Sequence, residues 1–233
     1  MQCVLICAGK GTRMLPLTES LPKPLISVCG KPLLDHVVEA LPSEITDLIL
    51  VVGYRQAQIR EYCGTSFHGR AVTYCEQQNY AGGTGDALRC AAGKIDGKFL
   101  FMYADDIHGA AAVEKVVQED HAMLGMHSDT PQHFGVLEQH EDGTLKEIVE
   151  KPAEPQSNLV NIGGFVVNST IFDFEVSESA EHGELLVTDM MNEYAKEHPV
   201  KIFKQDTWIP VGRPEDVARA EQLLCPERIE TSC

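Results

Sequence analysis

Apolar runs alternate with amphipathic segments through the first half of the chain. The apolar runs predict strands buried on both faces, at residues 2–8, 48–52, 71–75 and 99–103. Apolar positions recur at helical spacing in residues 32–41, 85–92 and 110–121. This alternation of strand and helix predicts a largely parallel sheet with right-handed crossovers.

The pattern changes after about residue 125. Residues 134–139 and 145–149 read as strands on either side of an Asp142-Gly143 pair, which is typical of a hairpin turn. Further on, we predict a strand at 159–167, a helix at 184–197, a strand at 200–204 and a closing helix at 214–224. The whole pattern predicts a single α/β domain over residues 1–233, with a mixed, mainly parallel sheet and a small antiparallel β extension.

Composition and charge restrict the classes of partner. Of the 233 residues, 43% are hydrophobic and 23% charged, which is typical of a globular protein. Nineteen Lys and Arg residues face 35 Asp and Glu residues, giving a net charge of −16 that repels nucleic acids and anionic membranes. No run approaches the roughly 20 apolar residues of a membrane span, and no basic segment precedes the first strand. We expect a soluble, cytoplasmic protein that binds anionic substrates only where cations or a divalent metal gather.

Cysteines are scattered along the chain. The eight are at positions 3, 7, 29, 63, 75, 90, 225 and 233, with no C-x-x-C pair, which argues against a structural zinc site. We expect buried free thiols, with a disulfide as the alternative for a thermophilic source.

Two segments near the N-terminus suit phosphate binding. The loop Ala8-Gly9-Lys10-Gly11-Thr12-Arg13 follows the first strand. Its glycine N–H groups and two cations can bind a polyphosphate. The same sequence is also consistent with a plain surface turn. It matches neither the P-loop nor the dinucleotide fingerprint. In Leu21-Pro22-Lys23-Pro24-Leu25 the prolines hold the backbone extended and fix the direction of Lys23, which otherwise would be a solvated lysine.

Residues 1–35 contain A-G-K-G-T-R-M-L-P-L-T, then L-P-K-P-L-I, then G-K-P-L-L. This series resembles the signature of the sugar-phosphate nucleotidylyltransferases, which join a nucleoside triphosphate to a sugar 1-phosphate. The resemblance implies a Rossmann-like nucleotide-diphospho-sugar transferase fold, with the triphosphate bound mainly by residues 1–125 and the sugar phosphate mainly by residues 126–233. It places around the triphosphate Ala8, Gly9, Lys10, Gly11, Thr12 and Arg13, with Lys23 near the reacting centre.

Paired acids end the apolar strand at 99–103, in the order Ala104-Asp105-Asp106. Carboxylates at a strand end suit magnesium, although acids there also cap turns and helices. The segment resembles the family's G-D-N or G-D-D, with Ala104 in the glycine position. The resemblance implies Mg²⁺ as cofactor, with Asp105 as its ligand and Asp106 as a neighbour.

A glycine-rich helix start follows Glu76-Gln77-Gln78, in the order Gly82-Gly83-Thr84-Gly85-Asp86. Either it is only a helix start, or its amide and N–H groups face a base. It resembles the family's Gln and G-T-G segment, with one extra residue, so Gln77 is preferred to Gln78, beside Gly83 and Thr84. The G-T-G segment favours UTP or dTTP, although guanylyl and cytidylyl relatives share the frame.

The second half carries shorter matches, each of which is also consistent with an exposed strand end or a helix face. The resemblance assigns the sugar hydroxyls to Gly135, Glu150 and Asn161, the sugar phosphate to Lys151, and further contacts to Glu184 and Thr188.

One departure concerns Trp208-Ile209-Pro210-Val211-Gly212, which resembles the family's W-x-D-x-G. Pro210 stands where a second metal-binding Asp or Asn is often found in the family, and a proline side chain cannot bind magnesium. Either Asp105 acts with phosphate oxygens and waters, which we favour, or Asp206 substitutes.

The resulting hypothesis is Mg²⁺-dependent in-line nucleotidyl transfer, with Arg13, Lys23, Asp105 and Lys151 as the catalytic residues and no protein nucleophile. Two rivals stay open: a nucleotide-sugar-dependent glycosyltransferase, and a catalytically silent paralogue that binds a nucleotide sugar. The expected partners are an NTP and a sugar 1-phosphate, and a homo-oligomer is expected with a symmetric dimer as the default.

Overall fold

The computed structural model describes residues 1–177, 183–205 and 207–226. Within these ranges the large sheet consists of β1 (Gln2–Cys7), β4 (Asp47–Val52), β5 (Ser66–Phe67), β6 (Arg70–Glu76), β7 (Lys98–Tyr103), β9 (Ala122–His127), β10 (Gly135–Gln139), β11 (Leu145–Glu150), β12 (Leu159–Asn168) and β13 (Lys201–Lys204). Two short antiparallel pairs stand apart: β2 (Ser27–Val28) with β3 (Lys31–Pro32), and β8 (Asp106–His108) with β14 (Trp208–Pro210). The α-helices are α1 (Leu33–Glu39), α2 (Gln56–Cys63), α3 (Gly83–Arg89), α4 (Ala110–Val116), α5 (Val187–Glu197) and α6 (Pro214–Leu224). None of the helices described is long and apolar enough to cross a membrane.

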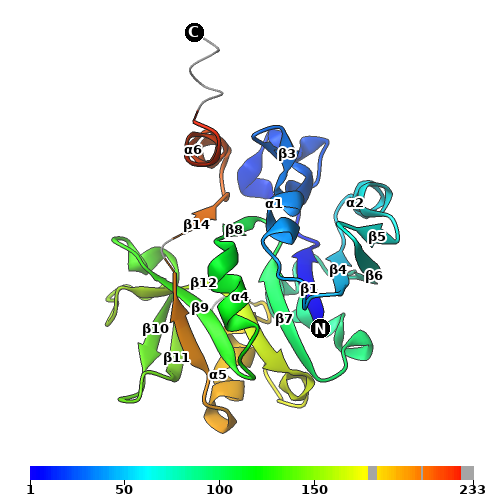
Figure 1. Cartoon of the computed structure of the whole chain (residues 1–233). Coiled ribbons are helices and arrows are strands. Elements are labelled where there is room, and N and C mark those ends of the chain that lie inside the picture. The colour runs from blue at the N-terminus through cyan, green and yellow to red at the C-terminus, as the bar shows by residue number, and fades with distance from the viewer. Residues whose placement is uncertain (178–182, 206, 227–233) are drawn as a thin grey trace.

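Parallel strands form the centre of the sheet. β7, β1, β4 and β6 lie side by side and parallel, and β12 pairs antiparallel with β7 (Figure 1). Beyond β12 the hairpin of β10 and β11 continues the same sheet, while β9 pairs with both β12 and β13. The predicted class is therefore confirmed: a mixed, mainly parallel sheet with an antiparallel extension.

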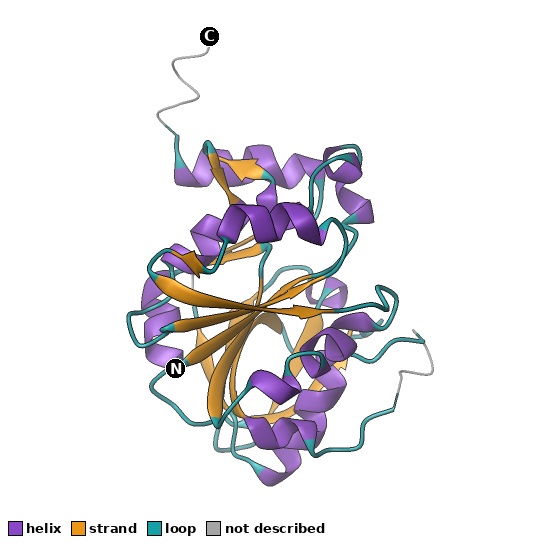
Figure 2. Cartoon of the chain, turned by 90° about the vertical axis from the view of Figure 1, so that its right-hand side faces the viewer, coloured by secondary structure: helices purple, strands orange, loops and turns teal. Residues whose placement is uncertain are grey.

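Alternate residues of β1 explain why this strand is apolar throughout. Cys3 and Leu5 pack in one hydrophobic cluster and Val4 in another, on the opposite face of the sheet. Helices lie on both sides of the twisted sheet (Figure 2), so both faces of its central strands are covered.

A third, smaller cluster fixes the N-terminal signature segments over the end of the sheet. It joins Met14, Ile26 and Val28 to residues of α1, β8, β14 and α6. Ile107 of β8 and Ile209 of β14 point into this cluster, each 6% exposed. Since side chains alternate along a strand, the neighbouring positions of β8 and β14 face the other way.

Several predicted boundaries were wrong. The helix expected at 110–121 ends at Val116, and the chain then enters β9, a strand that the pattern did not indicate. Met and Gly give β9 little intrinsic β preference, so its pairing with β12 and β13 decides its conformation. The helix expected from residue 184 begins at Val187. Helix α2 was also missed, because its only buried residues are Ile59 and Cys63.

The expectation of free cysteines was wrong for one pair. Cys29, in the turn between β2 and β3, forms a disulfide with Cys225 at the end of α6, 196 residues away in the sequence. The other cysteines described are free thiols, of which Cys3, Cys7, Cys63 and Cys75 are buried and Cys90 is partly exposed. Cys233 lies outside the described residues.

Candidate active site

The glycine loop after β1 brings the two signature segments together. Gly11 has a φ of +61°, in the left-handed region, and a Cβ there would lie 3.0 Å from Thr18 Cγ2 and 3.3 Å from Lys23 Cβ. The Thr18 hydroxyl donates to the Gly11 carbonyl at 2.8 Å. Upstream, the buried Ala8 accepts a hydrogen bond at its carbonyl from the Tyr54 amide at 2.9 Å. Glycine at position 11 therefore allows the loop to lie directly against the Lys23 segment.

The remaining loop residues face open space. A Cβ on Gly9 would meet no atom within 4 Å. Lys10 and Thr12 are exposed, with Lys10 Nζ 5.7 Å from the centroid of the Tyr80 ring. Arg13 is also exposed, in the single 3₁₀ turn Thr12–Met14. Two cations, Lys10 and Arg13, are thus accessible to an anionic ligand, as the phosphate hypothesis requires.

Lys23 forms an ion pair with Asp105, 82 residues away in the sequence. The side chain of Lys23 is 12% exposed and that of Asp105 is 31% exposed. Lys23 lies between Pro22 and Pro24, and Asp105 lies in the turn between β7 and β8. At the carboxyl end of β7, Lys23 is therefore fixed by an ion pair, and the carboxylate of Asp105 remains partly accessible to solvent.

Asp106 follows directly and is half-buried. Burial raises the pKa of its carboxyl well above the ordinary value, and the charge of Asp105 raises that pKa further. Lys23, the indole of Trp208 and Arg13 each lower the pKa of Asp106. Arg13 and Lys23 thus both act on Asp106.

The β8–β14 pair sets the surroundings of Asp106. Pro210 lies directly opposite Asp106, and Trp208 directly opposite His108. His108 is 3% exposed, and its Nδ1 lies 2.8 Å from Gln205 Nε2. Burial lowers the pKa of His108 to about 4, against the opposing charge of Asp105. Among the described residues, His108 Nε2 is buried without a hydrogen-bond partner.

The polar side chains at the start of α3 make hydrogen bonds within the protein. The Gln77 side chain is 4% exposed, and its Nε2 donates to the Gly83 carbonyl at 3.1 Å and to Asp86 Oδ2 at 2.9 Å. Thr84 Oγ1 accepts from the Val187 amide at 3.1 Å. Gln77 is therefore held inside the protein, whereas Gln78, the alternative, is exposed.

The predicted sugar-phosphate residues meet at the ends of β10, β11 and β12. Gly135 pairs with Glu150, and a Cβ on Gly135 would lie 3.2 Å from Glu150 Oε2 and 3.6 Å from Asn161 Cβ. Asn161 Oδ1 accepts from the Gly163 amide at 2.9 Å. Lys151, with a φ of +41° and a side chain 57% exposed, forms an ion pair with Glu150 at 2.8 Å. These residues converge, and the lysine stays accessible.

Glu184 and Thr188 lie beside α3. A Cβ on Gly83 would lie 2.9 Å from Glu184 Cβ, so the 184–186 segment packs against the start of α3. Leu185 exchanges backbone hydrogen bonds with Gly82 and Gly85, which explains why α5 does not begin earlier. Thr188 is 6% exposed in the first turn of α5.

Tyr103, which the sequence reasoning missed, lies between the two groups of residues. A Cβ on Gly163 would lie only 2.7 Å from the Tyr103 ring. Burial raises the pKa of Tyr103; a hydrogen bond with Thr84 lowers it, and the Asp106, Glu150 and Asp105 carboxylates raise it. Tyr103 therefore lies near both the paired acids of β7–β8 and the Glu150 cluster. The sequence signal that could have identified Tyr103 as a site residue is its position at the end of an apolar strand, just before the paired acids.

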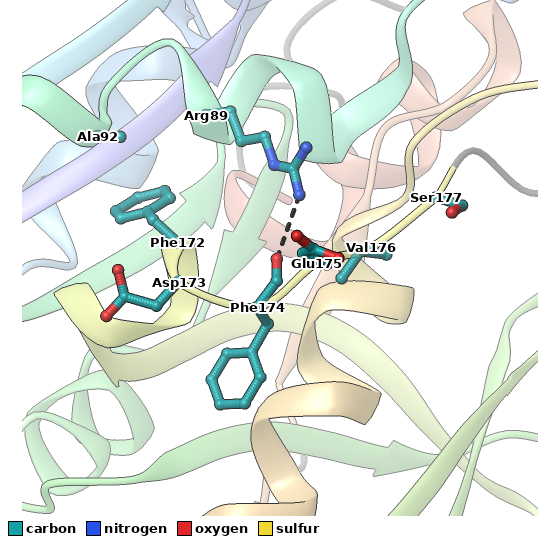
Figure 3. A pocket seen from close by; sticks show the side chains of 8 residues that line it. All are labelled: Arg89, Ala92, Phe172, Asp173, Phe174, Glu175, Val176 and Ser177. Carbon is teal, nitrogen blue, oxygen red and sulfur yellow. Dashed lines mark hydrogen bonds between the residues drawn. The ribbon is translucent and has the colours of Figure 1, made fainter.

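A separate hollow of about 480 Å³ lies between α3 and residues 172–177 (Figure 3). Arg89 crosses it and donates to the Phe174 carbonyl at 3.4 Å. The hollow shares no residue with the predicted site.

Comparisons with known proteins match nearly the whole chain. A sequence model described as nucleotidyl transferase matches residues 2–226. The "Bifunctional protein GlmU" of Methanocaldococcus jannaschii is 33% identical over 226 residues, covering 96% of this chain and 54% of that protein. The chain thus spans about half the length of such relatives. The "UTP--glucose-1-phosphate uridylyltransferase AglF" of Haloferax volcanii is 32% identical over 243 residues, covering 100% of each chain.

Solved structures share the fold. A Bacillus anthracis protein named for glucose-1-phosphate thymidylyl transfer, solved with a sucrose, has a TM-score of 0.84 at 27% identity, covering 96% of this chain and 94% of that one. A UDP-glucose pyrophosphorylase complexed with UDP-glucose has a TM-score of 0.85 at 23% identity, covering 97% and 99%, and supports the fold alone.

Proposed function

The chain belongs to the nucleotidyl transferase family, and on that premise we propose that it makes a nucleotide sugar and pyrophosphate from a nucleoside triphosphate and a sugar 1-phosphate. UTP with glucose 1-phosphate is the first proposed substrate pair, because the relative AglF carries that name and matches over the full length of both chains. The thymidylyl name of the Bacillus anthracis structure makes dTTP the second choice. A cytoplasmic location and a homo-oligomer are further parts of this proposal.

The ion pair of Lys23 with Asp105 is the observation that carries the proposal. It joins Lys23 to the strand-end carboxylate, beside the glycine loop, whose Gly11 lies against the Lys23 segment.

In the proposed reaction, an oxygen of the sugar 1-phosphate attacks the α-phosphorus of the triphosphate, and the bond to the β-phosphate oxygen breaks as pyrophosphate leaves. The glycine loop would hold the triphosphate, and Arg13 and Lys23 would offset the charge that grows on its oxygens. Lys151 would hold the incoming phosphate, with Gly135, Glu150 and Asn161 at the sugar hydroxyls. Gln77, Gly83 and Thr84 would lie on the base side, and Glu184 and Thr188 would make further contacts to the sugar phosphate. Binding the reacting groups together in line supplies much of the rate increase.

The carboxylate at the end of β7 fits magnesium, which prefers hard oxygen ligands. The described residues contain no group of three or more His, Cys, Asp or Glu side chains arranged around a common point. Asp105 would therefore hold the ion with help from substrate oxygens and waters. When bound, the ion would neutralise phosphate charge. Asp206, the alternative ligand, lies outside the described residues.

Pyrophosphate release on mixing UTP, dTTP, CTP, GTP or ATP with a series of sugar 1-phosphates tests the proposal. Release without any sugar acceptor supports nucleotidyl transfer and excludes a glycosyltransferase. Tight binding of a nucleotide sugar with no release for any pair would instead support the silent paralogue, which the Pro210 departure keeps open.

A further inference from the structure

We propose that the ring of Tyr80 is the surface against which the nucleobase of the triphosphate stacks. The inference rests on the proposed function for the nucleotide site. It adds to that site a residue from the stretch in which this sequence is one residue longer than the family's motif. Three observations support it: the place of the ring beside the glycine loop, its exposure without an aromatic partner, and the internal hydrogen bonds of Gln77.

Tyr80 lies beside the glycine loop that would hold the triphosphate. A Cβ on Gly53, just after β4, would lie 2.8 Å from Tyr80 Cε1 and 2.9 Å from the Ala8 carbonyl oxygen. The ring and the start of the glycine loop therefore both lie close to Gly53. Lys10 Nζ is 5.7 Å from the centroid of the same ring. Because Gly83, on the proposed base side, follows shortly in the sequence, Tyr80 lies between the two parts of the nucleotide site.

Hydrogen bonds hold the turn that carries Tyr80. The Gly82 amide donates to the Asn79 carbonyl at 3.0 Å, and the Ala81 amide donates to Asn79 Oδ1 at 3.2 Å. The Gly82 carbonyl in turn accepts from the Leu185 amide at 3.0 Å. The ring is thus placed before a ligand arrives, which lowers the entropy cost of binding.

The Tyr80 ring is exposed, and nothing in the protein explains its exposure. Tyr62 and Tyr80 are the exposed aromatic side chains of the described residues, each 43% exposed. Tyr62 donates to Asp35 Oδ2 at 2.8 Å and packs edge-on against Phe67. Within the described ranges, no other aromatic ring packs on Tyr80 and its hydroxyl makes no hydrogen bond. A base stacked on this ring would remove apolar surface of both rings from water.

The internal hydrogen bonds of Gln77 leave the base without an amide donor from this residue. Gln77 Nε2 donates to the Gly83 carbonyl and to Asp86 Oδ2. Both partners are acceptors, so they fix the orientation of the amide and use both of its hydrogens. Gln77 therefore keeps only its oxygen for a ligand, and one such hydrogen bond contributes modestly to affinity. Stacking on Tyr80 would supply affinity that does not depend on the hydrogen-bond pattern of the base.

Removing the ring should weaken binding of a nucleotide without weakening binding of its phosphates. In calorimetric titrations of the full-length protein with Mg²⁺ present, we expect Tyr80→Ala to raise Kd for UTP by about 10- to 100-fold, the effect of losing one base–aromatic stack. Inorganic tripolyphosphate, which has the phosphate chain and no base, should bind this variant and the wild type with nearly the same Kd. Tyr80→Phe should bind UTP as the wild type does, because the hydroxyl takes no part in stacking.

Tyr62→Ala is the matched control for Tyr80→Ala. The Tyr62 ring is equally exposed but belongs to α2, away from the glycine loop. Its loss should leave Kd for UTP unchanged.

A tryptophan in place of Tyr80 reports the stack directly. Trp208 is the only tryptophan in the chain, so Tyr80→Trp combined with Trp208→Phe leaves a single indole at position 80. A base stacked on an indole quenches its fluorescence. We expect UTP to quench the emission of this variant and tripolyphosphate to leave it unchanged.

Three results would overturn the proposal: wild-type Kd for UTP in Tyr80→Ala, equal losses of affinity for UTP and tripolyphosphate, or no quenching of the single indole by UTP. The second result would show that Tyr80 only anchors its loop. These measurements need no sugar phosphate and no turnover. If the wild type binds UTP but releases no pyrophosphate, the proposed function fails while the role of Tyr80 is still decided. If the wild type binds no UTP, both proposals fail.

Discussion

Replacing Lys23 by alanine removes the cation that the structure places most firmly at the site. Two prolines fix its backbone, its side chain is 12% exposed, and its ammonium pairs with Asp105. At about 4 Å and an effective dielectric constant of about 20, a pair of unit charges interacts by about 4 kcal/mol. Loss of one such contact to the developing charge costs about 100- to 1,000-fold in rate, or about 2.7–4 kcal/mol. We expect kcat/KM for pyrophosphate release to fall by that factor in Lys23→Ala.

The fold should survive this change. Asp105 is 31% exposed, so water can solvate its carboxylate once Lys23 is gone, and we expect the free energy of unfolding to fall by only about 1 kcal/mol. Thermal unfolding followed by circular dichroism measures this directly, beside steady-state pyrophosphate release with UTP and glucose 1-phosphate.

Lys31→Ala is the matched control for Lys23→Ala. Lys31 is also an ion-paired lysine, with Glu39, but its side chain is 36% exposed and it lies in β3, outside the predicted site. Its loss should leave kcat/KM within about twofold of wild type, as for most exposed ion pairs. Retention of more than about a tenth of wild-type kcat/KM by a folded Lys23→Ala protein would refute the electrostatic reasoning. A loss of rate that merely follows a large loss of stability would refute it too.

Three further predictions concern binding, the disulfide and pH. Lys151→Ala removes an accessible cation that pairs with Glu150. We expect it to raise KM for the sugar 1-phosphate at least about tenfold and to leave KM for the triphosphate nearly unchanged. Equal rises in both KM values would contradict the assignment of Lys151 to the sugar phosphate. Cys29→Ser should lower the free energy of unfolding by about 2–5 kcal/mol in guanidinium titrations, because the disulfide to Cys225 closes a long loop. Dithiothreitol should have no further effect on the stability of this variant. Burial lowers the pKa of His108 to about 4, so its ring stays neutral in the folded protein above that pH. In the unfolded chain the same ring takes up a proton below about pH 6.5. The free energy of unfolding therefore decreases as the pH falls from about 6.5 to about 4. The difference in unfolding free energy between wild type and His108→Gln should therefore shift by about 3 kcal/mol over that interval, and an unchanged difference would show that His108 titrates normally.

Local patterns determined the elements whose sequence is strongly periodic. The four predicted strands of the first half appear as β1, β4, β6 and β7, and the closing helix appears as α6 with the expected bounds Pro214–Leu224. These succeed because burial on both faces, or a proline at a helix start, leaves its mark within a few neighbouring residues. The signature segments likewise carried the family, since their spacing lies within one stretch of sequence.

Tertiary structure alone decided how distant segments meet. Strand β9 exists because β12 and β13 pair with it, and α5 starts late because Leu185 bonds to the start of α3. No local signal links Cys29 to Cys225, and none makes Gln77 a buried partner of Asp86.

For the candidate site too, the sequence determined some features and the tertiary structure decided others. Residue types and motif spacing were enough to select Lys23, Asp105 and Lys151 as candidates. Pro210 faces Asp106 because of the register between two strands that are about a hundred residues apart in the sequence. The packing of Ile107 and Ile209 in a cluster drawn from distant segments sets that register. Sequence periodicity determines which faces are apolar, while the pairing of those faces is a property of the folded chain.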